Sequence, residues 1–287
     1  MDFELSEALT ELVGFLASFL ATGAVGFRYV VLRADAAEEV VVARRAARRA
    51  AMLGFIGALV TAVMYVTLTL PRIAARSHTS IAGAITSSGP TLIGTICIAL
   101  IVIGFALALG HVRLGWALAT AGVLIGPLTN LFYGAWLRAV NPIHRLAGGL
   151  WIGTLFLMLI AGFTTVLHSD LPPIRRGSIA ANMVHRFSPL ALIAFAILGM
   201  TGLTTAWTHL KRIDALWTTE YGWTLIAKLF VVVIVVALGA WNWRRQRPLL
   251  GTESAAAVLR RSAAAEVIAA TIVLVITSVL VSLPSPK

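Results

Sequence analysis

Charged residues are scarce in this sequence. They make up 12% of its 287 residues, about half of the roughly 25% that is typical of a soluble domain, whereas 59% of the residues are hydrophobic. A water-soluble globule of this size needs about twice as many charges to cover its surface, so that class is excluded. With a mean hydropathy of +0.91, the sequence instead predicts an all-α protein that crosses the lipid bilayer several times.

Cysteines and catalytic motifs are also lacking. The single cysteine, Cys97, lies in an apolar run, which excludes an intramolecular disulfide and any metal site built on a pair of cysteines. The sequence contains no Walker loop, dinucleotide-binding fingerprint, serine nucleophile elbow or HExxH motif. ATP hydrolysis and the familiar hydrolase chemistries therefore have no support, and a transporter or binding protein is favoured over an enzyme.

Eight segments reach the roughly 20 apolar residues that a helix needs to cross the hydrocarbon layer. They lie at about 9–32, 50–70, 90–110, 114–137, 143–167, 187–209, 220–243 and 262–283. The first is interpreted as a retained span, because acidic residues stand where a signal peptide carries Lys or Arg. The longest loops, roughly 71–89 and 168–186, are too short for an independent core, so we expect residues 1–287 to form one membrane domain.

Prolines and glycines predict helix ends and close helix contacts. Pro90 and Pro142 are expected in the first turns of spans 3 and 5, where a missing N–H costs nothing. Pro71 and Pro284 are expected to follow helix ends. The glycines at the two ends of Gly149–Gly153 form a GxxxG motif, which predicts that span 5 packs closely against another helix.

The positive charge indicates orientation rather than binding to nucleic acid. The net charge is +11, yet the arginines gather at the ends of apolar runs. Of the 23 Lys and Arg residues, 14 lie in the loops after spans 1, 3, 5 and 7, seven lie on the other side, and Arg28 and Lys228 lie within spans. Because positively charged loops stay in the cytoplasm, we expect both termini outside.

Three polar residues in spans 7 and 8 are functional candidates, because ionisable side chains at membrane depth are costly. Lys228 is expected about 12 Å below the start of span 7, and Glu266 about 7.5 Å above the cytoplasmic start of span 8. A Lys228–Glu266 pair is within reach if the helices touch, and Asn242 is expected to contact Glu266 and to help couple ion movement to protonation. The alternative is that Lys228 extends to the membrane surface while the other two only hold the helices together.

Two histidines and two methionines are candidate metal ligands on the outer side. His144 and His209 offer imidazole, the commonest transition-metal ligand and the usual axial ligand of b-type haem. Met64 and Met200 lie in the outer halves of spans 2 and 6 and supply thioethers for copper(I), although each alone is also consistent with packing. Solvated or interfacial positions are favoured for the other histidines, which are His78, His111, His168 and His185.

Four stretches in the second half of the chain carry a resemblance to a known family. They are His144–Gly153, Arg186–Ser188 with Gly199–Gly202, Tyr221 through Lys228 to Asn242, and Leu259–Ser262 with Glu266 and Leu283–Pro284. In these stretches residues 138–287 resemble the copper resistance D (CopD) family of bacterial inner-membrane proteins, whereas the first 135 residues match only in hydropathy. The resemblance implies eight spans, an outer N-terminus and copper handling, usually import, often with an outer copper-binding partner of the CopC type.

We therefore interpret the chain as a multi-pass inner-membrane protein that binds or transports copper, with His144 at the outer mouth and His209, Met64 and Met200 as further ligands. Neutral imidazole binds metal ions, so uptake should weaken as the pH falls through the histidine pKa, about 6.5 in an ordinary environment. Two alternatives stay open at this point. One is a redox protein in which paired histidines bind haem b, and the other is a structural or assembly protein without an ion path.

Overall fold

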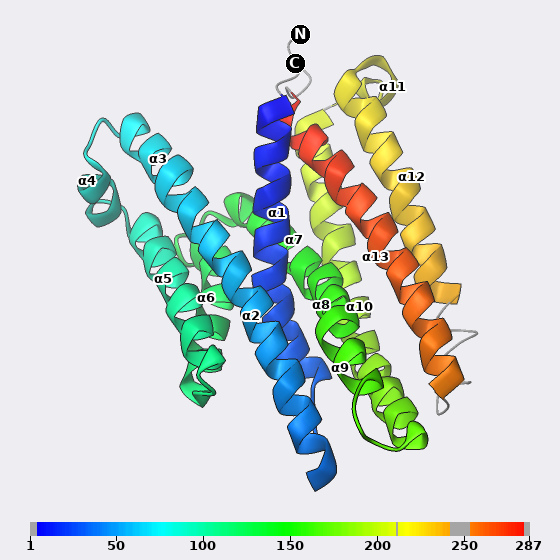
Figure 1. Cartoon of the computed structure of the whole chain (residues 1–287). Helices are drawn as coiled ribbons and strands as arrows, with labels where there is room; N and C mark the ends of the chain where they lie inside the picture. Colours follow the sequence, from blue (N-terminus) through cyan, green and yellow to red (C-terminus); the bar gives the residue numbers. More distant parts are fainter. Residues whose placement is uncertain (1–4, 211, 242–252, 284–287) are drawn as a thin grey trace.

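The computed structural model describes residues 5–210, 212–241 and 253–283, and every regular element in these ranges is helical (Figure 1). Eight helical stretches are long and apolar enough to cross a membrane, which confirms the predicted all-α bundle of eight spans. They run over Leu5–Val31, Ala37–Arg76, Gly89–Leu109, Arg113–Phe132, Trp136–Leu167, Pro173–Leu210, Glu220–Trp241 and Ala264–Ser282.

Several spans combine more than one helical element. The first contains α1 (Leu5–Gly26) and the π-helical turn η1 (Phe27–Val31), and the second contains η2 (Ala37–Glu39), α2 (Val40–Met64), the π-helical turn η3 (Tyr65–Thr69) and α3 (Leu70–Arg76). Next come α4 (Ile81–Thr86), α5 (Gly89–Leu109) and α6 (Arg113–Phe132). The fifth span contains α7 (Trp136–Gly148), η4 (Gly149–Gly153), α8 (Thr154–Leu157), η5 (Met158–Phe163) and α9 (Thr164–Leu167). The last helices are α10 (Pro173–Leu210), α11 (Ala215–Thr218), α12 (Glu220–Trp241) and α13 (Glu253–Ser282).

Several helices continue past the apolar stretches that predicted the spans. The second span runs over Ala37–Arg76 rather than about 50–70, and the sixth over Pro173–Leu210 rather than 187–209. Most of the predicted loop 168–186 is therefore helical, and α4 occupies part of the predicted loop 71–89. Hydropathy indicates only the stretch that suits the hydrocarbon layer, whereas a helix extends beyond it wherever its polar residues reach water.

The predicted positions of the prolines are only partly correct. Pro90 lies in the first turn of α5, as predicted. Pro142 lies inside α7 rather than at its start, and Pro71 lies in a helical stretch that continues to the end of α3. The wider π-helical turn η3 directly precedes Leu70 and loosens the hydrogen-bond pattern that a proline ring otherwise disrupts. Pro284 lies outside the described residues.

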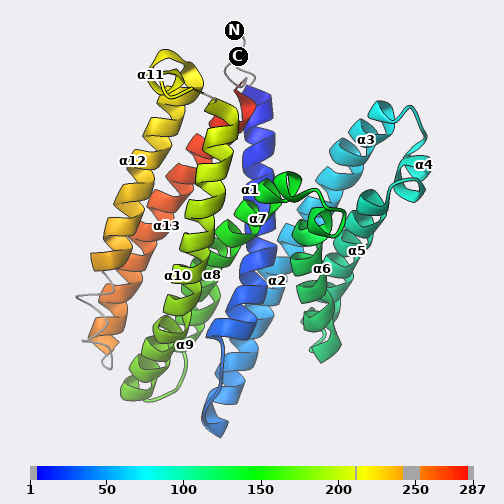
Figure 2. The ribbon, with the colours of Figure 1, turned by 180° about the vertical axis from the view of Figure 1, so that it is seen from behind.

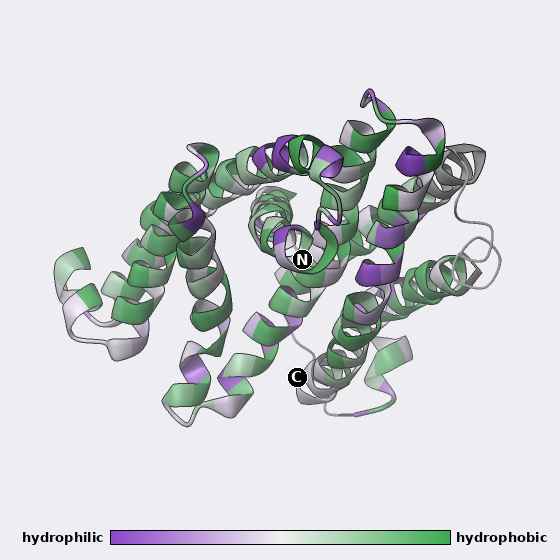
Figure 3. Cartoon of the chain, turned by 90° about the horizontal axis from the view of Figure 1, so that it is seen from below, coloured by the Kyte–Doolittle hydropathy of each residue, from purple (hydrophilic) through white to green (hydrophobic). Residues whose placement is uncertain are grey.

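Helix α1 lies at the centre of the bundle. It packs against α2, η4, α8 and α13, and Figure 1 shows it between α2–α6 on one side and α10, α12 and α13 on the other. Seen from behind, α7 crosses between these two groups (Figure 2). Hydrophobic residues predominate along the helices (Figure 3), and many large ones are exposed, as lipid contact requires.

The close helix contact predicted from the GxxxG motif is present, and its partner is α1. A Cβ atom on Gly23 would lie 2.2 Å from the backbone carbonyl carbon of Gly153. A Cβ atom on Gly153 would lie 2.2 Å from the carbonyl oxygen of Phe19. Because neither position has room for a side chain, the two backbones touch directly.

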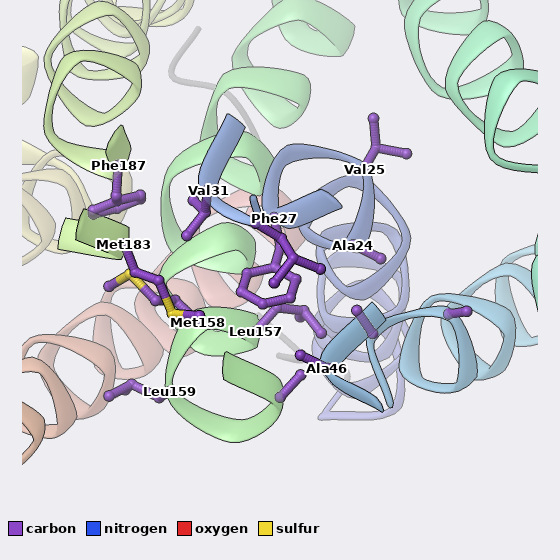
Figure 4. Close-up of a cluster of buried hydrophobic side chains, with 14 of the residues drawn as sticks. Ala24, Val25, Phe27, Val31, Ala46, Leu157, Met158, Leu159, Met183 and Phe187 are labelled. Atoms are coloured by element: carbon purple, nitrogen blue, oxygen red, sulfur yellow. The ribbon is translucent and has the colours of Figure 1, made fainter. Parts of the chain in front are cut away.

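The two ends of the bundle differ in packing. Helix α1 begins and α13 ends at the same end, here called the terminal end, whereas the arginine-rich beginning of α2 lies at the opposite, basic end (Figure 1). The main core lies toward the basic end. Figure 4 shows Phe27, Leu157 and Met158 packed with Met183 and Phe187 of α10. Two smaller buried clusters, around Phe15 and Phe19 and around Tyr221 and Leu225, lie in the terminal half together with the candidate sites.

Candidate functional site

His144 lies in the third turn of α7 and reaches α10. Its Nδ1 is 2.8 Å from the hydroxyl oxygen of Thr201, and that hydroxyl donates its single proton to the Ile197 carbonyl at 2.6 Å. The threonine oxygen therefore accepts from Nδ1–H of the neutral imidazole. The other ring nitrogen, Nε2, keeps its lone pair, which is the form of histidine that binds a metal ion.

His209, near the end of α10, is held in the same tautomer. Its Nδ1 lies 2.8 Å from the Thr205 carbonyl oxygen, which can only accept, so Nδ1 carries the hydrogen and Nε2 the lone pair. The ring stacks on Tyr221 of α12, with centroids 5.9 Å apart and planes 7° apart. The hydrogen bond and the stacked ring together fix the orientation of this imidazole.

The two histidines are anchored on one face of α10. Their anchoring residues, Thr201 and Thr205, are four positions apart, about 6 Å along the helix axis. The Thr205 hydroxyl is also hydrogen-bonded to the amide oxygen of Asn141 on α7, at 3.1 Å. His144 thus lies between α7 and α10, whereas His209 lies between α10 and α12, and the residues that hold them on α10 are one helical turn apart.

Lys228 of α12 lies next to this interface. Its side chain is half-buried, and its charge acts on the His144 imidazole. Since like charges repel, a metal ion bound at His144 and a charged Lys228 disfavour each other.

The structure separates Lys228 from Glu266, so the predicted pair is wrong. The carboxylate of Glu266 lies beside Gly239, with Oε2 4.0 Å from the position of a Cβ atom on that glycine. Gly239 is about 16 Å further along α12 than Lys228, beyond the reach of the lysine side chain. Counting residues from the helix ends does not determine the relative axial position of two neighbouring helices. Asn242, the other predicted partner of Glu266, lies outside the described residues.

The two predicted methionine ligands lie away from the two histidines. Met200 precedes Thr201 on α10, but 73% of it is exposed on the bundle surface. Met64, at the end of α2, lines a cavity whose lining includes neither His144 nor His209. Of the four predicted ligands, His144 and His209 are therefore the two whose rings are held by hydrogen bonds to residues of α10.

The remaining histidines lie in turns or toward the basic end. His78 and His111 occupy turns with positive φ angles of 51° and 64°. His168 donates from Nδ1 to the Thr164 carbonyl at 2.8 Å, and His185 lies within α10. Over the described ranges, no group of three or more His, Cys, Asp or Glu side chains is arranged to hold a metal ion. An ion at the α7–α10 interface therefore meets few protein ligands.

Three residues of the candidate site were missed by the sequence analysis: Asn141, Thr201 and Thr205. The available signal was spacing, because Thr201, Thr205 and His209 recur every fourth residue and so share one helix face. Hydroxyl residues are common in membrane helices, so this spacing alone does not single out a site.

The fold and the site define a multi-pass, all-helical membrane protein with two imidazoles at an interface between spans. Residues 181–280 match the family model described as Copper resistance protein D, which assigns this part of the chain to the CopD family and confirms the resemblance. The matched region includes Thr201, His209 and Lys228, whereas His144 precedes it. The protein is thus a multi-pass membrane protein in which residues 181–280 match the CopD family.

A similar curated protein is named Copper transport protein CutJ, from Bacillus subtilis (strain 168). The two sequences are 28% identical over 144 residues, which cover 50% of this chain and 25% of that protein. The chain thus aligns with about a quarter of the length of this relative. No solved structure gives a significant match.

Proposed function

We propose that the protein transports copper inward across the bacterial cytoplasmic membrane. The CopD match and the similarity to a protein named for copper transport support the choice of metal. One observation carries the choice of site: the hydrogen bond of Thr201 holds His144 between two spans with Nε2 available as a ligand. His209, held by the carbonyl of Thr205 one helical turn from Thr201, is the proposed second imidazole.

In this proposal the terminal end faces outside. The excess of Lys and Arg in the loops at the basic end supports this orientation, because such loops stay in the cytoplasm. Copper then enters from the terminal end, supplied by a copper-binding partner of the CopC type. The low number of protein ligands suits an ion in transit, since tight coordination would slow its release.

The polar residues follow one another along the proposed route. His209 lies nearest the terminal end, His144 and Lys228 come next, and Glu266 lies further toward the basic end beside Gly239. A copper ion at His144 disfavours the charged form of Lys228, so its arrival favours release of a proton. Glu266 is 8% exposed and is the proposed next polar group on the path.

Copper accumulation by cells that produce each variant tests the proposal. His144→Ala should abolish accumulation, because the variant removes the ligand that Thr201 positions. His78→Ala is the matched control, since His78 lies in an exposed turn and should leave accumulation unchanged. The amount of protein and its thermal unfolding, measured alongside, exclude loss of the fold.

Three outcomes would contradict the proposal. Full accumulation by folded His144→Ala would remove the ligand role. An absorption band of haem in the purified protein, lost in His144→Ala and His209→Ala, would favour the redox alternative. Purified protein that binds neither copper nor haem would favour a structural role.

A further inference from the structure

A cavity of about 470 Å³ lies in the terminal half of the bundle, between α1, α2 with its extension to α3, α5, α6 and α7. On α1 its lining runs from Thr10 to Thr22, about 18 Å along the helix. The cavity is therefore elongated and reaches from near the terminal end toward the middle of the bundle. Its lining includes neither proposed copper-binding histidine, but it does include Asn141, which accepts from Thr205, so the cavity adjoins the histidine site across α7.

The charges in this cavity favour an anion. Three charged side chains line it, Glu11, Arg72 and Arg145, so positive charge is in excess by one. Arg145 Nη2 lies 3.6 Å from Glu11 Oε2, and its guanidinium carbon lies 4.3 Å from the centroid of the Phe15 ring. Arg72 takes part in no ion pair with any residue that the structure describes. Its guanidinium is therefore available to a ligand.

The hydroxyls of Thr61 and Tyr65 in the lining are hydrogen-bonded within the protein. The Thr61 hydroxyl donates to the Gly57 carbonyl at 2.8 Å, and the Tyr65 hydroxyl is hydrogen-bonded to that of Thr95 at 3.0 Å. The apolar part of the lining includes Ala58, Ile98, Ile101 and Val123. An apolar wall combined with arginines suits a ligand with an acid group and a hydrocarbon part.

Two sulfur-containing side chains, Met64 and Cys97, also line the cavity and in isolation would suit copper(I). However, Met64 Sδ lies 3.8 Å and Arg145 Nη2 lies 3.6 Å from the same point, the position of a Cβ atom on Gly14. A bare cation beside the thioether would thus meet a guanidinium nearby and be repelled. The sulfur atoms are better explained as part of the apolar wall.

We propose that this cavity binds a small amphipathic anion, a carboxylate or phosphate ester with a hydrocarbon part. The acid group would lie at Arg72 and Arg145, whose planar guanidinium groups match its oxygen atoms. The hydrocarbon part would lie along the apolar wall. A membrane lipid and a free acid from solution both offer this chemistry, and the proposal goes beyond copper transport.

Binding of decyl phosphate to the full chain, purified in an uncharged detergent, tests the proposal, with decyltrimethylammonium as the probe of opposite charge. Titration calorimetry should detect binding of the anion only. Arg72→Gln should weaken that binding about 10- to 100-fold. Glu11→Gln should strengthen it, and a variant that merely loses its fold cannot gain affinity. Arg138→Gln, at an exposed arginine of α7 outside the lining, is the matched control and should bind like the wild type.

The source of the ligand is identified by lipid extraction. A phospholipid that co-purifies with the wild type but not with Arg72→Gln points to the membrane, whereas binding of added decyl phosphate without such a lipid points to solution. Both results support the proposal. Equal binding of the two probes, or unchanged affinity in both Arg72→Gln and Glu11→Gln, would overturn it. His144→Ala should leave decyl phosphate binding unchanged. Failure of the copper proposal can therefore be told apart from failure of the anion proposal.

Discussion

The Thr201 hydroxyl in α10 decides which nitrogen His144 presents. A threonine in a helix commonly donates its proton to a carbonyl in the preceding turn, which leaves its oxygen able only to accept. Thr201 does this toward Ile197, so His144 must place its hydrogen on Nδ1. The metal-binding capacity of His144 therefore depends on two side chains, its own imidazole and the Thr201 hydroxyl that orients it.

Replacing Thr201 tests this pairing. Thr201→Val keeps the shape of the side chain but removes the acceptor for Nδ1–H, so the ring loses its fixed tautomer. We expect the copper affinity of the purified protein to fall about 10- to 100-fold, as for other residues that orient metal-binding histidines. Thr201→Ser, which restores the hydroxyl, should retain the wild-type affinity.

Thr204→Val is the control for this prediction. The Thr204 hydroxyl also donates to a carbonyl one turn earlier, that of Met200 at 3.0 Å, and it has no hydrogen bond to a histidine among the described residues. Copper affinity should therefore be unchanged in Thr204→Val. If both valine variants weakened binding equally, a general loosening of α10 would explain the result and the positioning role of Thr201 would be wrong.

Sequence alone identified the residues of the candidate site that are costly to bury, but not their partners. His144 and Lys228 stand out because polar groups are rare at membrane depth. Thr201 is 57 positions away from His144, and nothing local in the sequence links the two. The wrong Lys228–Glu266 pair has the same origin, since pairing depends on how neighbouring helices slide and rotate.

At the scale of helices, the contact between α1 and η4 holds the centre of the bundle together. Its closeness depends on Gly23 and Gly153, where the backbones touch. The motif that predicted it lies in a π-helical turn, and a second π-helical turn, η5, follows in the same span. Each such turn rotates the residues after it relative to an ideal α-helix. Beyond Gly149, the periodicity of an ideal α-helix therefore no longer predicts which residues share a face.

Gly23→Ala should destabilise the bundle. The added Cβ would lie 2.2 Å from the backbone of Gly153, so the helices must separate, and overpacking of this kind costs about 1 to 3 kcal/mol. Thermal unfolding in detergent should show a lower Tm. Gly199→Ala is the control, because no atom lies within 4 Å of its added Cβ and alanine favours a helix. An unchanged Tm for Gly23→Ala would show that this contact does not limit stability.

The number and type of the helices followed from the sequence, whereas their ends did not. Apolar length fixes how many segments can cross a bilayer, and all eight were identified. The first part of α10, from Pro173, is too polar for the hydropathy criterion yet is helical. Pro142 looked like a helix start because the sequence does not reveal the turn of helix that precedes it.

At the scale of the whole molecule, the two proposed sites lie on opposite sides of α7. The cavity lies toward α5 and α6, and the histidines lie toward α10. The main core around Phe27 and Met158 (Figure 4) lies toward the basic end, whereas both proposed sites lie in the terminal half. This arrangement separates the arginines that favour an anion from the imidazoles proposed to bind a cation.

The direction of transport depends on which side of the membrane the terminal end faces. Ala34, exposed between η1 and η2, and Thr79, exposed between α3 and α4, lie at opposite ends of the second span. In a Cys97→Ser background, an impermeant thiol reagent should label Thr79→Cys in intact cells and Ala34→Cys only after lysis. Labelling of Ala34→Cys in intact cells would show that the basic end faces outside and that the histidines face the cytoplasm. Copper would then reach them from inside, and the proposal of inward transport would be wrong even if His144 proved to be a ligand.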